Sequence, residues 1–386
     1  MLGLLRSMSY LAIVKWKAGE RRALASLWPS RKNNLTPLFE MPPSGDFDHE
    51  KQRPLTPLEH IRLFGKRLHD AWGRSLAFID AMAVDDDTHK AGLLVHPLTE
   101  LLERAQTARA LACPATSLKH SPEYQDAVRR FAAHYSHLPI AIRVNPLDDM
   151  ENESFAKEFA NFLDYLGCTP DRVVLVLDFA SLGALKPHEV ESFVETVTER
   201  IYDAIELGPW LKVVTAFTSL PTLLKMKPNT VETFPRTDWA AYRLLLERES
   251  ALRSMVAYGD YAIDSAPFGK PSGPVAPSAQ LRFSSEEHYV VVKGVQTKKP
   301  IGYAAIRPVA KTLVERDEFI GPAFCEGDAF VDRLVHDAKT GTGNASTWRW
   351  AGTDHHFARV LADLATLAGR EPTVPVTPEE AQMELF

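Results

Sequence analysis

Charged and amide side chains stand at the ends of short apolar runs along the first two thirds of the chain. Eight runs have the length and composition of strands, and six of them end on a charged residue or an Asn. The polar residues at or just before these ends are Lys15, Lys17, Glu40, Asp80, Arg143, Asn145, Asp178 and Asp260. If the ends meet, three cations and four carboxylates form one ring, whose charges would shift one another's pKa values toward those of acid–base catalysts.

The cations of this set are suited to binding an anion. Strand alternation predicts that Lys15 and Lys17 share a face, with Trp16 opposite. Arg143 adds a planar fork that matches a phosphate or a carboxylate. A further interpretation makes Lys15 or Lys17 a Schiff-base nucleophile, with its pKa lowered by the neighbouring ammonium group. Nearby carboxylates argue against it, because they would keep the lysines charged.

The carboxylates are candidates for acid–base chemistry. We expect catalytic roles for Glu40, Asp178 and Asp260, and ligand-binding roles for Asp80 and Asn145. Carboxylates also suit Mg²⁺ or Mn²⁺, so a divalent cofactor is a further expectation, with no defined metal motif. The alternative is that each charge is only a solvated strand end.

Two adjacent histidines near the end of the chain are further catalytic candidates. His355 and His356 follow an Asp, and adjacent residues of a helix face different ways, so one of them is expected to reach the site as a general acid or ligand. The alternative is that Thr353 or Asp354 begins the last helix and that both histidines lie in its first turn.

Additional ligand-binding candidates come from the rim of the predicted site. Tyr258 precedes a glycine that allows a close turn, while Arg282 and Lys293 could reach over the site from a predicted hairpin. The aromatic pair Trp348 and Trp350 suits either stacking on a ligand or packing in the core, and core packing is favoured.

The elements that must position these residues alternate between strand-like and helix-like segments. The strand-like runs cover residues 11–17, 35–40, 76–80, 111–117, 140–145, 173–178, 213–219 and 255–260. We therefore expect an α/β fold with a closed (β/α)8 TIM-like barrel over residues 1–265 and the site at the carboxyl ends of the strands. An open doubly wound sheet is the alternative, but no Gly-rich phosphate loop follows the first run.

The pattern changes after the eighth run. Residues 280–284 and 288–294 alternate without an intervening helix and predict an antiparallel hairpin. Helical segments are expected near residues 302–316, 329–338 and 354–368. We interpret residues 266–386 as an α+β appendage packed beside the barrel.

Composition excludes several classes of protein. The chain has 386 residues, 45% of them hydrophobic, and a net charge of -6, so it lacks the cationic field of a protein that coats DNA. Its three cysteines, Cys113, Cys168 and Cys325, are too far apart for a disulfide framework or a Cys-based zinc motif. The absence of a signal peptide or a membrane-spanning run favours a protein of the reduced cytoplasm with no membrane association.

Five motifs occur together in a characteristic order. They are Leu11-Ala-Ile-Val-Lys-Trp-Lys-Ala-Gly-Glu20, Pro37-Leu-Phe-Glu-Met-Pro-Pro43, Tyr258-Gly-Asp-Tyr261, Val292-Lys-Gly294 and Gly352-Thr-Asp-His-His356 after a Trp. Through them the chain resembles the phage-type "beta protein" family, found in phages and in bacterial defence or mobile regions. The resemblance covers most of the chain and implies a role in phage–host conflict, but it assigns no substrate.

Residues and resemblance together lead to one hypothesis and one alternative. The hypothesis is an antiphage-defence barrel protein that binds or processes a phosphorylated ligand, a nucleotide or a nucleic-acid end, with a hydrolase- or phosphodiesterase-like activity. The alternative is a non-catalytic sensor or specificity subunit for a partner effector, such as a nuclease, from the same defence operon. If Lys17→Met abolished defence and the protein showed no detectable enzymatic turnover, the alternative would be favoured.

Overall fold

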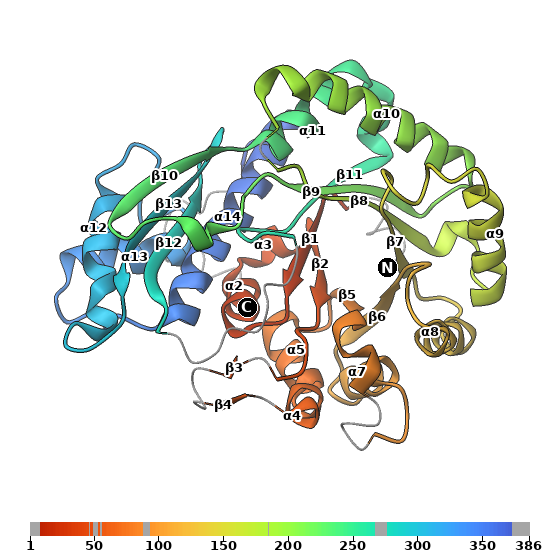
Figure 1. Cartoon of the computed structure of the whole chain (residues 1–386), viewed down its shortest axis with the longest axis horizontal. Helices are drawn as coiled ribbons and strands as arrows, with labels where there is room; N and C mark the ends of the chain where they lie inside the picture. The colour runs from red at the N-terminus through yellow and green to blue at the C-terminus, as the bar shows by residue number, and fades with distance from the viewer. Residues whose placement is uncertain are drawn as a thin grey trace.

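The fold is known from a computed structural model that describes residues 8–45, 47–48, 53–54, 56–87, 93–183, 185–266 and 276–372. Its centre is a closed barrel of parallel strands in the order β1-β11-β9-β8-β7-β6-β5-β2 (Figure 1). The strands are β1 (Tyr10–Lys15), β2 (Leu35–Glu40), β5 (Leu76–Asp80), β6 (Leu111–Thr116), β7 (Ile140–Val144), β8 (Val173–Ser181), β9 (Lys212–Thr218) and β11 (Val256–Asp260). The predicted (β/α)8 barrel is confirmed.

Helices follow the strands along the chain and pack outside the barrel (Figure 1). They are α2 (Ala18–Ser26), α3 (Pro29–Lys32), α4 (Pro57–Arg62), α5 (Phe64–Trp72), α7 (Pro97–Thr107), α8 (Pro122–His134), α9 (Phe155–Leu166), α10 (Val190–Glu206) and α11 (Thr237–Arg248). Thr56 and Glu59 form a capping box at the start of α4, and Ser121 caps α8. Helices α4 and α5 meet at Leu63.

Short elements connect these helices and strands. The 3₁₀ helices are η1 (Met82–Asp87), η2 (Pro170–Arg172), η3 (Pro187–Glu189), η4 (Leu223–Lys225), η5 (Ser250–Ser254) and η6 (Gly302–Ala305). A two-stranded antiparallel pair, β3 (Phe47–Asp48) and β4 (Arg53–Pro54), lies in the long connection after β2.

The second sheet contains the predicted hairpin and one strand that we did not expect. Strands β12 (Ser278–Ser284) and β13 (His288–Gln296) pair antiparallel as predicted. Strand β10 (Thr230–Pro235), which lies between the seventh and eighth predicted barrel strands, pairs with the other edge of β13. The division into residues 1–265 and 266–386 stays a prediction, and β10 departs from it.

The last helix joins the two sheets. The appendage contributes α12 (Ile306–Val314), α13 (Glu326–His336) and α14 (Ala345–Leu367). Helix α14 lies between the three-stranded sheet and the barrel in Figure 1, and it packs on α2, α13 and β12. The expectation that Thr353 or Asp354 begins this helix was wrong, because Asn344 caps it and forms a capping box with Thr347. Both histidines therefore lie in the middle of the helix.

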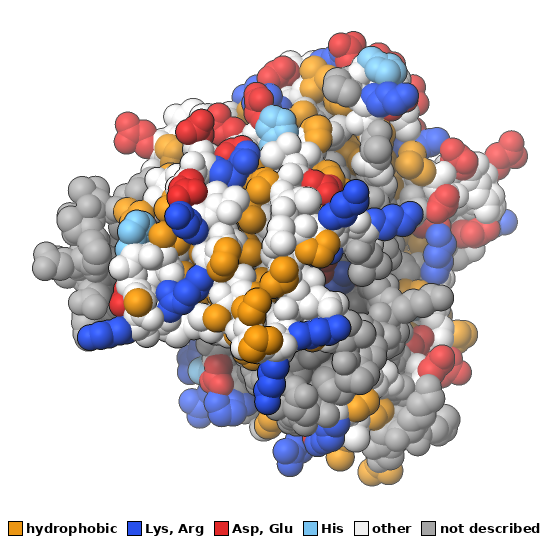
Figure 2. Space-filling model, turned by 60° about the vertical axis from the view of Figure 1, so that its left-hand side comes forward, with side chains coloured by type: hydrophobic (Ala, Val, Ile, Leu, Met, Phe, Trp, Pro, Cys, Tyr) orange, Lys and Arg blue, Asp and Glu red, His pale blue; other side chains and the backbone are white. Residues whose placement is uncertain are grey.

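A continuous apolar core runs from the barrel into the appendage. It includes Trp348 and Trp350, so the core-packing interpretation of this pair holds. On the face shown in Figure 2, basic, acidic and apolar side chains are interspersed. Within the described residues, no helix combines the length and apolar character needed to cross a bilayer.

Candidate functional site

Arg143 binds three carboxylates at the barrel mouth, by which we mean the carboxyl-terminal ends of the eight strands. Its Nη1 donates to Oε1 of Glu40 at 2.9 Å and to Oδ2 of Asp80 at 2.7 Å, and its Nη2 donates to Oδ2 of Asp178 at 2.6 Å. The hydroxyl of Tyr261 donates to Oδ1 of Asp178 at 2.8 Å. Burial opposes the charge of Arg143, but the surrounding groups raise its pKa well above the usual value. Four strand ends thus meet in one network, as the sequence predicted for these residues.

The pKa values of two carboxyl groups of this network are shifted in opposite directions. Burial raises the pKa of Glu40 above its usual value, and Arg143 offsets this only in part. Burial also acts on Asp80, but His120, whose Nε2 lies 3.4 Å from its Oδ1, and Arg143 hold the pKa of Asp80 below its usual value. The second oxygen of Glu40, Oε2, is buried without a hydrogen-bond partner. Within this network, Glu40 is therefore the carboxyl group whose protonated form burial favours.

A second cluster, centred on Asp264, lies beside the first. The Asp264 carboxylate contacts Lys15 Nζ at 3.2 Å, Arg282 Nη1 at 3.3 Å and Arg349 Nη1 at 3.5 Å. Glu20 lies 3.8 Å from Arg349, so three cations face two carboxylates. Burial and then the charge of Arg349 lower the pKa of Arg282 to about 10. Burial and the neighbouring guanidinium group of Arg349 thus raise the free energy of the charged form of Arg282.

A narrow cleft joins the two clusters, and its volume of about 10 Å³ has room for about one water molecule. Its walls include Lys15, Glu40, Tyr261, Asp264 and Arg349. Lys15 and Glu40 are direct neighbours in the register of β1 and β2, which places a cation of one cluster beside the carboxylate of the other whose Oε2 has no hydrogen-bond partner. A ligand in this cleft would meet anion-binding groups and a candidate acid together.

Asp260 and His356 do meet, but in the interior. Oδ2 of Asp260 lies 2.9 Å from Nε2 of His356, and Nδ1 of His356 lies 2.6 Å from Oγ of Ser284. Tyr10 donates its hydroxyl hydrogen to the other oxygen of Asp260 at 2.6 Å. The order Asp–His–Ser is that of a hydrolase triad, but these side chains are completely buried and no reactant reaches them. The catalytic roles expected for Asp260 and His356 are thus replaced by a role in packing.

Five other predicted residues lie away from the cleft. Lys17 is exposed at the residue before α2, because β1 ends at Lys15, so the two ammonium groups do not share the mouth. Asn145 is held by hydrogen bonds within the loop after β7, and Tyr258 is buried in the aromatic core. Lys293 donates to the backbone oxygen of Met226 at 2.7 Å. His355 turns away from the mouth toward α13 and also does not reach the cleft.

Sequence reasoning missed several residues of the mouth. Tyr261 and Asp264 lie within four residues of the end of β11, so a wider search beyond each strand end would have included them. His120 follows β6 in the same way. Glu20 and Arg349 come from helices α2 and α14, and no feature of the sequence places helical residues at the mouth.

Comparison with known proteins identifies a family. A family model described as Beta protein matches residues 10–362. No curated protein matches the chain. Among solved structures, pyruvate carboxylase T882A of Rhizobium etli with acetyl coenzyme A aligns at 10% identity and a TM-score of 0.33, over 92% of this chain and 28% of that one. The carboxyl transferase domain of the same enzyme aligns at 11% identity and a TM-score of 0.34, over 99% of this chain and 53% of that one.

A smaller protein also aligns. It is a sugar phosphate isomerase/epimerase from Parabacteroides distasonis, at 8% identity and a TM-score of 0.29, over 68% of this chain and 88% of that one. The chain spans only 28% and 53% of the first two matched chains, and these alignments assign no activity to it.

Proposed function

This chain belongs to the Beta protein family, and we propose that its barrel mouth binds the phosphate of a nucleotide or of a nucleic-acid end. Lys15, Arg282 and Arg349 hold the anion, and Glu40 is the acid–base group beside it. The observation that carries the proposal is the convergence of these three cations on one carboxylate, Asp264, at the edge of a cleft. We propose further that the protein acts in the cytoplasm in antiphage defence.

The charge balance of the Asp264 cluster supports anion binding. Burial and then the charge of Arg349 lower the pKa of Arg282 to about 10. A bound phosphate would share the guanidinium donors with Asp264 and would favour the charged form of Arg282. Arg143, expected from sequence to hold the anion, is already bound to Glu40 and two other carboxylates, so its role is to position them.

Glu40 is the residue that would make the site catalytic. Burial raises its pKa above the usual value, and the unpartnered Oε2 is a position for contact with a leaving group. Such a group would serve hydrolysis of a phosphoester. Mg²⁺ or Mn²⁺ fits the mouth poorly, because Asp80 and Asp178 are engaged by Arg143, and we derive no step from a divalent ion.

A sensor without catalysis is the second candidate. The same internal pairing of Asp80 and Asp178 favours it, because a carboxylate bound to Arg143 is not free to activate water. In that case the mouth would bind the phosphorylated ligand and pass the signal to a partner effector encoded in the same operon. Glu40→Gln distinguishes the two candidates, since it removes the acid without removing the cations.

The direct test is calorimetric titration with inorganic phosphate, nucleoside mono- and triphosphates and a 5′-phosphorylated oligonucleotide. We expect wild type to bind at least one probe, and Arg349→Met to weaken that binding by at least about 10-fold. Arg248→Met is the matched control, because Arg248 makes only exposed ion pairs on α11. The absence of binding to every probe, or equal loss in both variants, would refute the proposal.

The defence role is tested separately by the plaquing efficiency of a phage panel on cells that carry the native operon. We expect Asp178→Asn to abolish protection if the mouth acts in defence, because a neutral side chain weakens the hydrogen bonds from both Arg143 and Tyr261. Folding of the variant is checked by circular dichroism. Unchanged protection with a folded variant would separate the mouth from defence. Protection lost in Arg349→Met but kept in Glu40→Gln would favour the sensor.

A further inference from the structure

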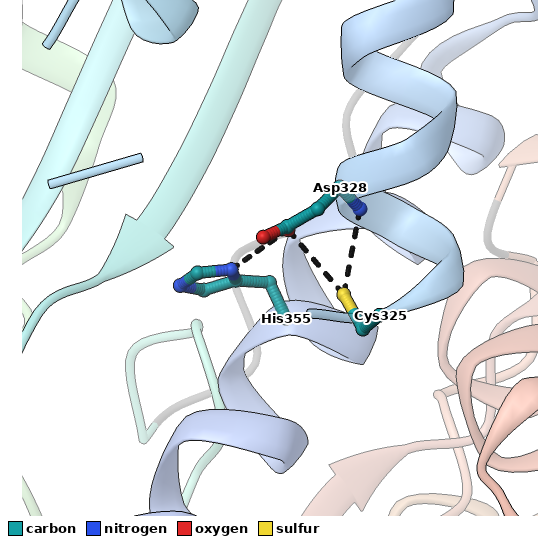
Figure 3. Close-up of side chains that lie close together, drawn as sticks. All are labelled: Cys325, Asp328 and His355. Carbon is teal, nitrogen blue, oxygen red and sulfur yellow. Dashed lines mark hydrogen bonds and ion pairs between the residues drawn. The ribbon is translucent and has the colours of Figure 1, made fainter. Parts of the chain in front are cut away.

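Three side chains of metal-ligand type converge in the appendage. Cys325 and Asp328 lie at the start of α13, His355 lies in α14, and Figure 3 shows all three pointing toward one another. One atom of each, the Cys325 Sγ, an Asp328 oxygen and a His355 ring nitrogen, lies within 4.8 Å of the other two. Among the described residues, this is the group of His, Cys, Asp and Glu that brings three such atoms together. All three side chains are buried.

The hydrogen bonds of His355 leave one ring nitrogen facing a carboxylate. Its Nε2 lies 2.9 Å from the backbone oxygen of Ser284, which only accepts, so Nε2 carries a hydrogen. In the neutral ring Nδ1 then has a lone pair, and it lies 2.8 Å from Oδ1 of Asp328, which also has lone pairs. A proton must lie between them, or a metal ion must take both lone pairs. A histidine that donates its other N–H to a backbone carbonyl is the usual arrangement around a metal ion.

Asp328 supplies a second, independent observation. Its Oδ1 also accepts from Cys325 Sγ at 3.3 Å, so both neighbours approach the same oxygen. Its Oδ2 is buried and has no hydrogen-bond partner. A completely buried carboxylate oxygen without a partner is costly unless another group binds there.

We infer that Cys325, Asp328 and His355 form a binding site for a zinc-type transition-metal ion, separate from the barrel mouth. Thiolate, imidazole and carboxylate are the ligands of tetrahedral Zn²⁺ sites. Ligand atoms on a tetrahedral Zn²⁺ are roughly 3.3–3.6 Å apart. The contacts of 2.8 and 3.3 Å are slightly shorter, so small outward shifts accommodate the ion. Oδ2 of Asp328 or a water completes the coordination.

The charges and protons balance on binding. The ion displaces the thiol proton of Cys325 and the proton between His355 and Asp328, and no oxidation is involved. Asp354, which accepts from Gly327 N at 2.8 Å, and the buried Arg31 are the other charged groups beside the site. With two ligand anions, Asp354 ionised, Arg31 charged and Zn²⁺ bound, the charges sum to zero.

The site would tie two helices together. Cys325 and Asp328 belong to the first turn of α13, and His355 belongs to the helix that packs on the barrel. Because the site is enclosed, the ion would have a structural role, and it would stabilise the appendage in proportion to its affinity. The expectation that no zinc motif exists was based on the spacing of cysteines, whereas this group uses a single one.

The test uses the full-length protein without a metal-binding tag. We expect one Zn²⁺ per chain by mass spectrometry after purification, and recovery of one equivalent when the chelator-treated protein is titrated with Zn²⁺. With Co²⁺ as the probe, we expect the near-ultraviolet band of a thiolate-to-metal transition together with tetrahedral visible bands. These measurements on wild type need no variant, so a variant that fails to fold does not affect them.

Variants assign the ligands. Cys325→Ser should remove the thiolate band, and His355→Gln should weaken Zn²⁺ binding by at least about 100-fold. Cys168→Ser is the matched control, because this buried cysteine is not part of the group, and its metal content should equal that of wild type. A wild-type protein that binds no Zn²⁺ or Co²⁺, a Co²⁺ spectrum without the thiolate band, or a band that survives Cys325→Ser would overturn the inference.

Discussion

Nε2 of His356 lies 2.9 Å from Oδ2 of Asp260, and this contact joins the last helix to the last barrel strand. Both side chains are completely buried. Burial alone would raise the pKa of Asp260, but the charge and hydrogen bond of His356 keep it below the usual value. Helix α14 therefore links the end of β11 to the second sheet, on which it packs through β12, and the same helix brings Arg349 to the mouth.

The pair predicts a large effect of His356→Ala on stability. The change leaves Asp260 buried without its main partner, and breaking a buried pair from one side lowers the free energy of unfolding by about 3–5 kcal/mol. Urea unfolding measures the difference. His336→Ala, at an exposed position of α13, is the control and should stay within about 0.5 kcal/mol of wild type. Equal effects of the two substitutions would show that Asp260 does not depend on His356.

Glu40→Gln should stabilise the protein at neutral pH. Burial raises the pKa of Glu40, so its ionised form lowers stability at every pH above its ordinary value, whereas Gln keeps an oxygen for Arg143 and carries no charge. We expect a gain of roughly 0.5–2 kcal/mol at pH 7 that disappears below about pH 4. Thermal unfolding across this pH range measures it.

The same experiment on Asp178→Asn provides the contrast. Asp178 accepts from Arg143 and from Tyr261, and a neutral residue weakens both bonds, so we expect a loss of about 1.5–3 kcal/mol. If Glu40→Gln were as destabilising as Asp178→Asn, Glu40 would be a structural member of the network and not a strained candidate acid.

Local sequence patterns predicted the barrel and half of the mouth. The residues 173–177 are consecutive Val and Leu, which only a strand buried on both faces accommodates, and β8 forms there. Glu40, Asp80 and Asp178 each end or follow such a run, so barrel closure alone brings them to Arg143. Here the position within a strand is sufficient to place the side chain.

The other half depends on packing that no local pattern encodes. Arg349 reaches Asp264 from a helix whose start, at Asn344, lies nine residues before the predicted one. The interior position of His356 follows from the path of that helix, so a pair of adjacent histidines could not be assigned to mouth or core. Strand β10 alternates half-buried and exposed residues at a sheet edge, and such strands give a weak sequence signal.

Acidic pH should lower the free energy of unfolding because it removes the charge of Asp264. Burial alone would raise the pKa of Asp264, but Arg349, Arg282 and Lys15 hold it well below the usual value. A depressed folded-state pKa gives stability that is present above the unfolded value, about 3.9, and is lost as pH falls below it. We therefore expect the free energy of unfolding to decline below about pH 4.

Asp264→Asn tests the origin of this decline. The variant should be less stable than wild type at pH 7, and the difference should shrink as the pH falls toward 3, because wild type loses the same charge by protonation. Asp70→Asn is the control, since Asp70 makes only an exposed pair with Lys66. A difference that stays constant with pH would place the effect in packing rather than charge.

Helix α14 packs closely on the second sheet, and this packing predicts that a larger residue at Gly352 lowers the stability of the protein. A Cβ atom at Gly352 would lie 2.4 Å from the backbone oxygen of Arg282, so Gly352→Ala must push α14 away from β12. We expect a loss of about 1–3 kcal/mol, typical of an overpacked interior. Gly341→Ala is the matched control, because a Cβ there meets no atom within 4 Å. Since Arg282 contributes to the cation cluster, Gly352→Ala should also weaken phosphate binding, whereas Gly341→Ala should leave both stability and binding unchanged. Full stability of Gly352→Ala would mean that α14 and β12 can separate without disturbing the fold.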